Sequence, residues 1–269
     1  MVRHIHLVIA RYDEDVSWVR EVVRALESAC MPSHVTVHMY EKGRTTDITP
    51  PTIVDSPRST FVSVRLPNVG RESHTYLEHV IRTRAHAQIS DGPPGSRADT
   101  SITVFLQGGM RDHVPMPHTT VSYVQALVDE ASCSDAGESR NHACHSHFGA
   151  FNAWPGMRAA MFARVGDSGQ TFREWFEGHI SPWIWTDVSQ GPSWWQNGVF
   201  AVRTCRFWSV DEEEEAQQED GGGDPVARVY NEFFEMLRGQ VAWHVNPEQG
   251  HFFERSWHHV FPPLLRPSS

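Results

Sequence analysis

The sequence predicts an α/β protein built on a mostly parallel central sheet flanked by helices, with an irregular second half. Short apolar segments alternate with segments of helical periodicity along the first half of the 269-residue chain. Repetition of strand, helix and strand is typical of parallel sheets whose helices cover the faces. Polar, glycine-containing segments follow several of the apolar ones, and such sheets bind ligands at the carboxyl ends of their strands. We expect a single domain over residues 1–269.

Four segments have the length and pattern of β-strands. His4–Ala10 is a short apolar run, and His34–Tyr40 alternates between polar and apolar residues. Phe61–Val64 is a short run with two valines, which favour strands. Ser101–Leu106 is a nearly continuous apolar run, as expected for a strand buried on both faces.

Three segments of the first half have helical periodicity. In Glu14–Cys30, valine and leucine recur at spacings of three and four residues. Arg71–Ala85 and Thr119–Ala131 carry apolar residues on one face in the same way. Residues 88–100 contain proline and glycine and are expected to form a loop.

The second half is less regular. It contains nine of the ten tryptophans, and short helices are expected only near Phe172–Phe176 and Val226–Leu237. Residues 211–224 contain eight acids, several glycines and no base, which predicts an acidic disordered loop.

The composition excludes several classes of function. No apolar run approaches the ~18 residues of a membrane span, and the first ten residues lack the core of a signal peptide, so we expect a cytoplasmic chain. The segment 211–224 accounts for most of the net charge of −10, which argues against a nucleic-acid partner. Lys42, the single lysine, precedes its glycine, which excludes a Walker-type phosphate loop. The four cysteines form no C-x-x-C pair, which indicates a reducing compartment.

A charged turn directly follows the first predicted strand. It contains Arg11, Asp13 and Glu14, and we assign these residues to ligand binding. The alternative is an N-terminal helix cap, in which acids satisfy free N–H groups and the helix dipole.

A second polar turn lies between the third strand and the following helix. It contains Asn68, Gly70, Arg71 and Glu72. Gly70 permits an unusual backbone angle, the helix N-terminus is an anion site, and an arginine can clamp a diphosphate with two hydrogen bonds. The alternative is a turn in which Arg71 and Glu72 are surface charges.

A third cluster follows the fourth strand. Gln107 is followed by two glycines, and then by Asp112 and His113, which are residue types that ligate metals. The alternative is a solvated loop. Because the carboxyl ends of parallel strands meet at one edge of the sheet, we expect Asp13, Arg71 and Asp112 to converge on one cleft.

A fourth cluster lies near the C-terminus. If this segment is helical, Glu254 and His258 share one face, and a carboxylate among aromatic residues has a raised pKa suited to a general base. The alternative is an amphipathic end helix. Trp195 is a candidate stacking platform for a sugar or base, although large aromatics more often belong to a core. The His142–His147 cluster has the spacing of no common structural zinc site.

Five blocks of sequence together carry a resemblance to a known family. They are LVIARYDEDVSWV, LPNVGRESHTYLEHVI, TVFLQG, NGVFAV and GHFFERSWHHVF, spaced from about residue 5 to residue 261. This series resembles the domain of unknown function 3431 family, found mainly in fungi and other eukaryotes. More distantly, the strand followed by Tyr-Asp-Glu looks like the opening of GT-A glycosyltransferases, and Asn68–Glu72 is similar to their Asn-x-Gly-Arg-Asp block.

The distant resemblance implies a GT-A-like fold and a role for each half of the chain. Residues 1–132 would be the nucleotide-binding half and residues 148–265 the acceptor half, with Glu254 as the base. The loop from Gln107 to His113 would hold a divalent cation, Mn²⁺ or Mg²⁺. Many relatives have aspartate where this chain has Gly109, which leaves Asp112 as the acid of that loop. Arginine 11, 71 or 111 is the alternative group to stabilise the leaving diphosphate.

The leading hypothesis is therefore a glycosyltransferase that moves a sugar from a nucleotide-diphosphate donor to the hydroxyl of a glycan or other acceptor. Glu254 would deprotonate that hydroxyl. A second hypothesis is a metal-dependent hydrolase that uses Asp112, His113 and His258. A third is a catalytically inactive carbohydrate- or nucleotide-binding module, which Gly109 favours.

Overall fold

The computed structural model describes part of the chain: residues 3–29, 34–43, 56–89, 101–114, 118–133, 164–165, 170–179 and 199–207. The contacts divide the chain into two compact units. The first unit comprises residues 1–68, 93–146 and 197–205, and the second comprises residues 69–92, 147–196 and 206–269.

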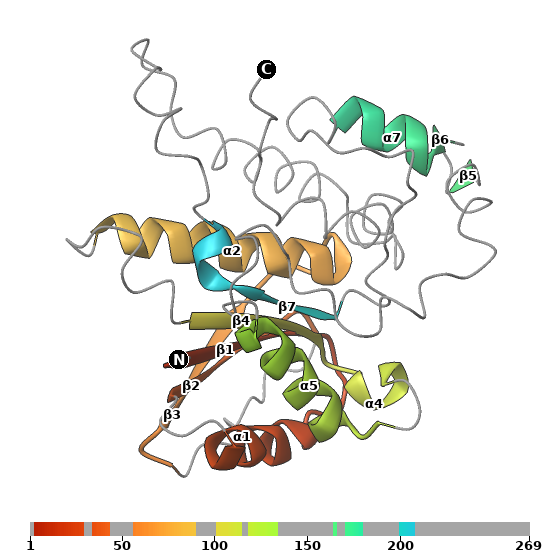
Figure 1. Ribbon diagram of the computed structural model, residues 1–269. Helices are drawn as coiled ribbons and strands as arrows, with labels where there is room; N and C mark the ends of the chain where they lie inside the picture. Colours follow the sequence, from red (N-terminus) through yellow and green to blue (C-terminus); the bar gives the residue numbers. More distant parts are fainter. Residues whose placement is uncertain are drawn as a thin grey trace. The chain divides into compact units, whose positions relative to one another are not determined.

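The first unit contains a five-stranded sheet with the order β3-β2-β1-β4-β7 (Figure 1). The first four strands of this order are mutually parallel, and β7 runs antiparallel to β4. The prediction of a mostly parallel α/β sheet is confirmed. The strands are β1 (His4–Arg11), β2 (His34–Glu41), β3 (Ser59–Arg65), β4 (Ser101–Gln107) and β7 (Phe200–Arg203).

The burial of each strand follows its place in the sheet. Central β1 and β4 carry buried apolar residues on both faces, including Leu7, Val8 and Val104, whereas His4 and His6 of β1 are only partly buried. β3 lies at the end of the strand order, and after the buried Ser59 its residues are partly buried or exposed. The apolar runs at the centre therefore supply most of the core, because a strand covered on both faces has no polar side to present to water.

Helix α1 (Trp18–Ala29) and helix α5 (Thr120–Cys133) pack against each other on one side of the sheet (Figure 1). The apolar face of α1 is buried through Val19, Val22 and Leu26, as the periodicity predicts. The predicted start of this helix at Glu14 is wrong by four residues. The acids before Trp18 accept hydrogen bonds in the turn itself, so the chain enters the helix only after Ser17.

The described part of the second unit contains α2 (Arg71–Ile89), α7 (Phe172–His179) and the short strands β5 (Arg164–Val165) and β6 (Gln170–Thr171). The predicted helix from Arg71 is confirmed and continues to Ile89. The predicted helical stretch near Phe172 is confirmed as α7. The helix predicted over Val226–Leu237 and the acidic segment 211–224 lie outside the described residues.

None of the helices in the described ranges is long and apolar enough to cross a membrane.

Candidate functional site at the carboxyl edge of the sheet

The order in which successive strands are added to the sheet reverses between β1 and β4. Strands β2 and β3 lie on one side of β1, and β4, the next strand along the chain, lies on its other side. The carboxyl ends of β1 and β4 are adjacent, since Ala10 pairs with Gln107. In open α/β sheets this reversal creates a crevice outside the strand ends, and ligands bind there. We therefore take the loops after β1 and β4 as the candidate site.

Arg11 joins the loop after β1 to the end of β2. Its Nη1 donates to both carboxylate oxygens of Glu41 at 3.2 Å, and its Nε donates to the carbonyl oxygen of Glu14 at 3.0 Å. The Glu41 side chain is 3% exposed and the Arg11 side chain 20%. A carboxylate this buried requires a paired cation, so Arg11 has a structural partner as well as a place at the site.

Glu14 closes the loop after β1 and lies against the glycines after β4. Its Oε2 accepts a hydrogen bond of 2.6 Å from the backbone N–H of Tyr12. A Cβ atom at Gly108 would lie 2.7 Å from the same oxygen and 3.2 Å from the Cα of Arg11. A residue with a side chain would therefore push the two loops apart, which explains why the first glycine of the pair is needed there.

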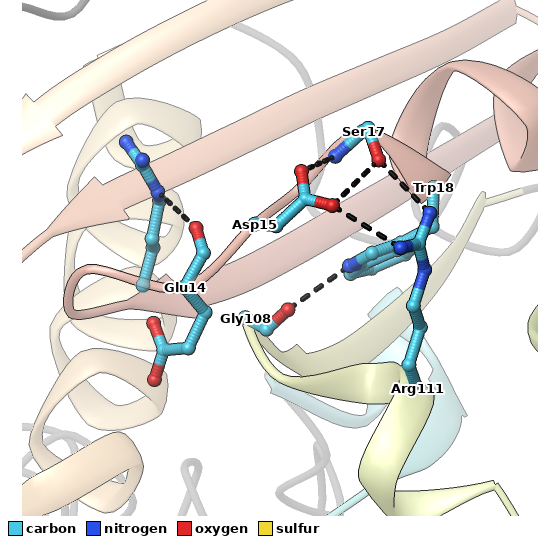
Figure 2. Close-up of polar contacts among 7 residues, drawn as sticks. Glu14, Asp15, Ser17, Trp18, Gly108 and Arg111 are labelled. Atoms are coloured by element: carbon cyan, nitrogen blue, oxygen red, sulfur yellow. Dashed lines mark hydrogen bonds and ion pairs between the residues drawn. The ribbon is translucent and has the colours of Figure 1, made fainter.

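A second set of contacts joins Asp15 and Ser17 to Arg111 in the short helix α4 (Met110–His113), as Figure 2 shows. Asp15 accepts hydrogen bonds of 2.9 Å from the N–H and the hydroxyl of Ser17, and Arg111 donates to the same carboxylate at 3.2 Å. The Ser17 hydrogen bonds lower the pKa of Asp15, and the charges of Arg111 and Arg11 lower it further. The carboxylate therefore stays ionised at neutral pH.

The end of β2 contributes residues that the sequence analysis did not assign to the site. Glu41 pairs with Arg11, and the N–H of Lys42 donates to the carbonyl oxygen of Arg11 at 2.8 Å. A Cβ atom at Gly43 would lie 1.7 Å from the Tyr12 carbonyl oxygen, so the loop after β1 lies directly on this glycine. Arg65, at the end of β3, donates to the Gly43 carbonyl. The signal was present, because Glu41-Lys42-Gly43 directly follows an alternating strand.

The structure places the predicted site residues of the first unit as follows. Arg11 ends β1, Gln107 ends β4 and is partly buried, and Asp13 and Glu14 lie in the loop between β1 and α1, where Asp13 is exposed. Asn68 is exposed after the end of β3. Asp112 and His113 lie in α4, where only their backbone is described. Arg11 and Glu14 are brought together by their own hydrogen bond.

Gly70, Arg71 and Glu72 lie in the second unit, at the start of α2. Gly70 has φ 58°, which confirms the unusual backbone angle expected there, and Arg71 has φ 52°. The Arg71 Nε lies 3.5 Å from a carboxylate oxygen of Glu72, and the N–H of His74 donates to the Gly70 carbonyl at 3.1 Å. Left-handed backbone at a non-glycine residue is costly and concentrates at functional sites. The convergence of Arg71 with Asp13 and Asp112 stays a prediction.

The remaining predicted residues are Trp195, Glu254 and His258, and they lie outside the described residues, as does the His142–His147 cluster. Among the side chains that the structure describes, no group of three or more histidines, cysteines and acids is arranged to hold a metal ion. The divalent cation therefore stays a prediction that rests on Asp112 and His113.

The fold and the site together define a class, that of α/β proteins with a mostly parallel, mixed sheet whose charged loops meet at the reversal of strand order. No family model, curated protein or solved structure matches the chain.

Proposed function

We propose that the carboxyl edge between β1 and β4 binds a nucleotide-diphosphate sugar, and that the chain transfers the sugar to the hydroxyl of a glycan or other acceptor. The observation that supports this most is the position of the charged loop after β1, at the reversal of strand order and against Gly108. The order β3-β2-β1 is also that of the first nucleotide-binding half of doubly wound α/β proteins, in which strand 4 likewise lies beside strand 1. This part of the support is an analogy of fold.

The transferase class rests on sequence resemblance. The Tyr12-Asp13-Glu14 turn and the Asn68–Glu72 block resemble GT-A glycosyltransferases, and the wider series of blocks resembles the domain of unknown function 3431 family. GT-A identity is therefore part of the proposal.

Arginine is the group to which we assign neutralisation of the leaving diphosphate. Arg111 is 59% exposed, and the two residues to which it donates hydrogen bonds, Asp15 and Ser17, are exposed residues of the loop after β1. A guanidinium held in this way can turn from a surface carboxylate to a phosphate at little cost, because exposed ion pairs are weak. Arg11 differs, since its buried pairing with Glu41 makes it a positioning residue for the loop.

The acceptor hydroxyl needs a base, and Glu254 is the candidate. Its carboxylate would take the proton as the hydroxyl oxygen attacks the anomeric carbon and the bond to the diphosphate breaks. A cation on Asp112 and His113 would add Lewis-acid stabilisation of the same leaving group, and the proposal requires no step through it.

Calorimetric titration of the full chain with UDP, GDP and their sugar conjugates, with and without Mn²⁺, tests the proposal. We expect binding of a nucleoside diphosphate that Arg111→Gln weakens by about tenfold or more. Arg173→Gln is the matched control, because Arg173 is also exposed and ion-paired, to Glu177 on α7. Binding unchanged in Arg111→Gln would remove this residue from the site.

Glu254→Gln keeps the shape of the side chain and removes its basicity. It should abolish sugar transfer while nucleotide binding stays within about twofold. Binding of the metal ion alone, without nucleotide binding, would favour the hydrolase that uses Asp112, His113 and His258. Binding of free glycans alone would favour a binding module without transferase activity.

A further inference from the structure

Four histidines lie together on one face of the sheet, outside the candidate site. Because alternate residues of a strand share a face, His4 and His6 of β1 lie on the same face as His34 and His38 of the neighbouring strand β2. The rings of His4 and His6 stack with centroids 4.2 Å apart, and the ring of His34 lies 4.9 Å from that of His4. All four side chains are partly buried. We call these residues the histidine cluster.

The central contact of the cluster requires neutral imidazole. The Nδ1 of His6 lies 3.1 Å from the Nε2 of His38, which is a hydrogen bond between two ring nitrogens. One of these nitrogens donates and the other accepts, and a protonated imidazole has no acceptor. If both rings are protonated, two donors face each other at this distance and the two positive charges repel.

The side chains that bond the cluster, and the residues of β4 in register with it, are neutral. Thr36 bonds His4 at 2.8 Å, and Thr60 of β3 bonds His34 at 3.3 Å. The residues of β4 in register with His4 and His6 are Ser101 and Thr103, which are neutral as well. Burial, and then the other members of the cluster, lower the pKa of His4, His6 and His38, and the residue before β1 is Arg3, a further positive charge.

We propose that the histidine cluster is an acid-sensitive device: protonation of its rings loosens the pairing of β1 with β2 and thereby releases the loops of the candidate site. The two strands that it joins are those that end in Arg11 and Glu41, whose ion pair anchors the loop after β1. This inference is independent of the ligand and the reaction proposed above.

The direction of the pH dependence follows from the pKa values. Burial, and then the charge of His4, lowers the pKa of His38 to about 4, and burial, followed by the neighbouring histidines, lowers the pKa of His6 well below its usual 6.5. Burial and His34 also lower the pKa of His4. The unfolded chain therefore binds more protons than the folded chain below the ordinary value of 6.5, so stability is full above it. For His38, stability is lost progressively as the pH falls to about 4.

Acid unfolding of the full chain, followed by circular dichroism and by amide exchange of β1 and β2, tests the device. We expect wild-type protein to lose protection of these strands as the pH falls from about 6 to about 4. The double variant His6→Gln, His38→Gln should shift the midpoint to lower pH by about half a unit or more, because the amides still hydrogen-bond and do not titrate. His118→Gln is the control, since His118 is another partly buried histidine of the first unit, two residues before the start of α5.

The result is decisive even if the double variant fails to fold. NMR titration of the wild-type imidazole resonances should show His6 and His38 titrating below the ordinary value of 6.5. Titration of His6 and His38 near 6.5, or an equal shift of the acid midpoint by His118→Gln, would overturn the proposal.

Discussion

The indole N–H of Trp18 donates a buried hydrogen bond of 2.9 Å to the carbonyl oxygen of Gly108, ninety residues further along the chain (Figure 2). Trp18 opens α1 and Gly108 directly follows β4, so this bond fixes the two loops of the candidate site to each other. A second bond, from the Gly108 N–H to the Ala10 carbonyl at 2.8 Å, holds the same glycine to the end of β1. The geometry of the site is therefore set by backbone and core contacts.

We predict that Trp18→Phe destabilises the protein by about 1–3 kcal/mol. Phenylalanine preserves most of the apolar contact of a side chain that is 2% exposed, and it leaves the Gly108 carbonyl without its donor. Urea denaturation followed by circular dichroism measures the change. An unchanged midpoint would show that the hydrogen bond contributes nothing to stability.

We predict that Gly108→Ala lowers the melting temperature by several degrees, because the new methyl group meets the Glu14 carboxylate and the Arg11 backbone. Adding Glu14→Ala should restore part of the loss, with a coupling energy of about 1 kcal/mol in a double-mutant cycle. Gly178→Ala is the control, because a Cβ at Gly178 meets no atom within 4 Å. Strict additivity of the two substitutions would contradict the close approach of the loops.

We predict that Glu41→Gln costs about 2 kcal/mol or more of stability. Arg11 then loses the carboxylate that neutralises its charge, and the loss is costly because the pair is largely buried, with the Glu41 side chain 3% exposed. Glu177→Gln breaks the exposed pair with Arg173 on α7 and should cost less than about 0.5 kcal/mol. Thermal unfolding of both variants gives the comparison, and equal costs would argue that burial of the Arg11–Glu41 pair has no consequence.

We predict that Arg71→Gly is more stable than Arg71→Ala by about 1 kcal/mol. Both variants lose the guanidinium, but only glycine adopts φ 52° without a steric cost. At Arg82, an exposed residue in the interior of α2, the order should be reversed, because alanine is the better helix former. Melting temperatures of the four variants measure both differences. Greater stability of Arg71→Ala than of Arg71→Gly would show that the left-handed backbone at this position carries no strain.

Much of the fold was predictable because strand and helix signals are local. The apolar runs at His4–Ala10 and Ser101–Leu106 predicted the central strands β1 and β4, and the 3.6-residue period predicted the buried face of α1. The start of α1 was not predictable in this way. Asp13, Glu14 and Asp15 have the composition of a helical first turn, but Glu14 accepts a hydrogen bond from Tyr12 and Asp15 from Ser17, and these bonds keep the chain in a loop there.

The sequence by itself determined the α/β class, the polar clusters at the strand ends and the left-handed turn at Gly70, because each depends on residues close together in the chain. Only the tertiary structure decided the strand order, which places the loop after β1 beside the glycines after β4. It likewise decided the partners of Glu41, Gly43 and the histidine cluster. Paired residues of the parallel strands lie 24 to 97 positions apart in the chain, and such long-range pairings leave no period or spacing in the sequence from which they can be predicted.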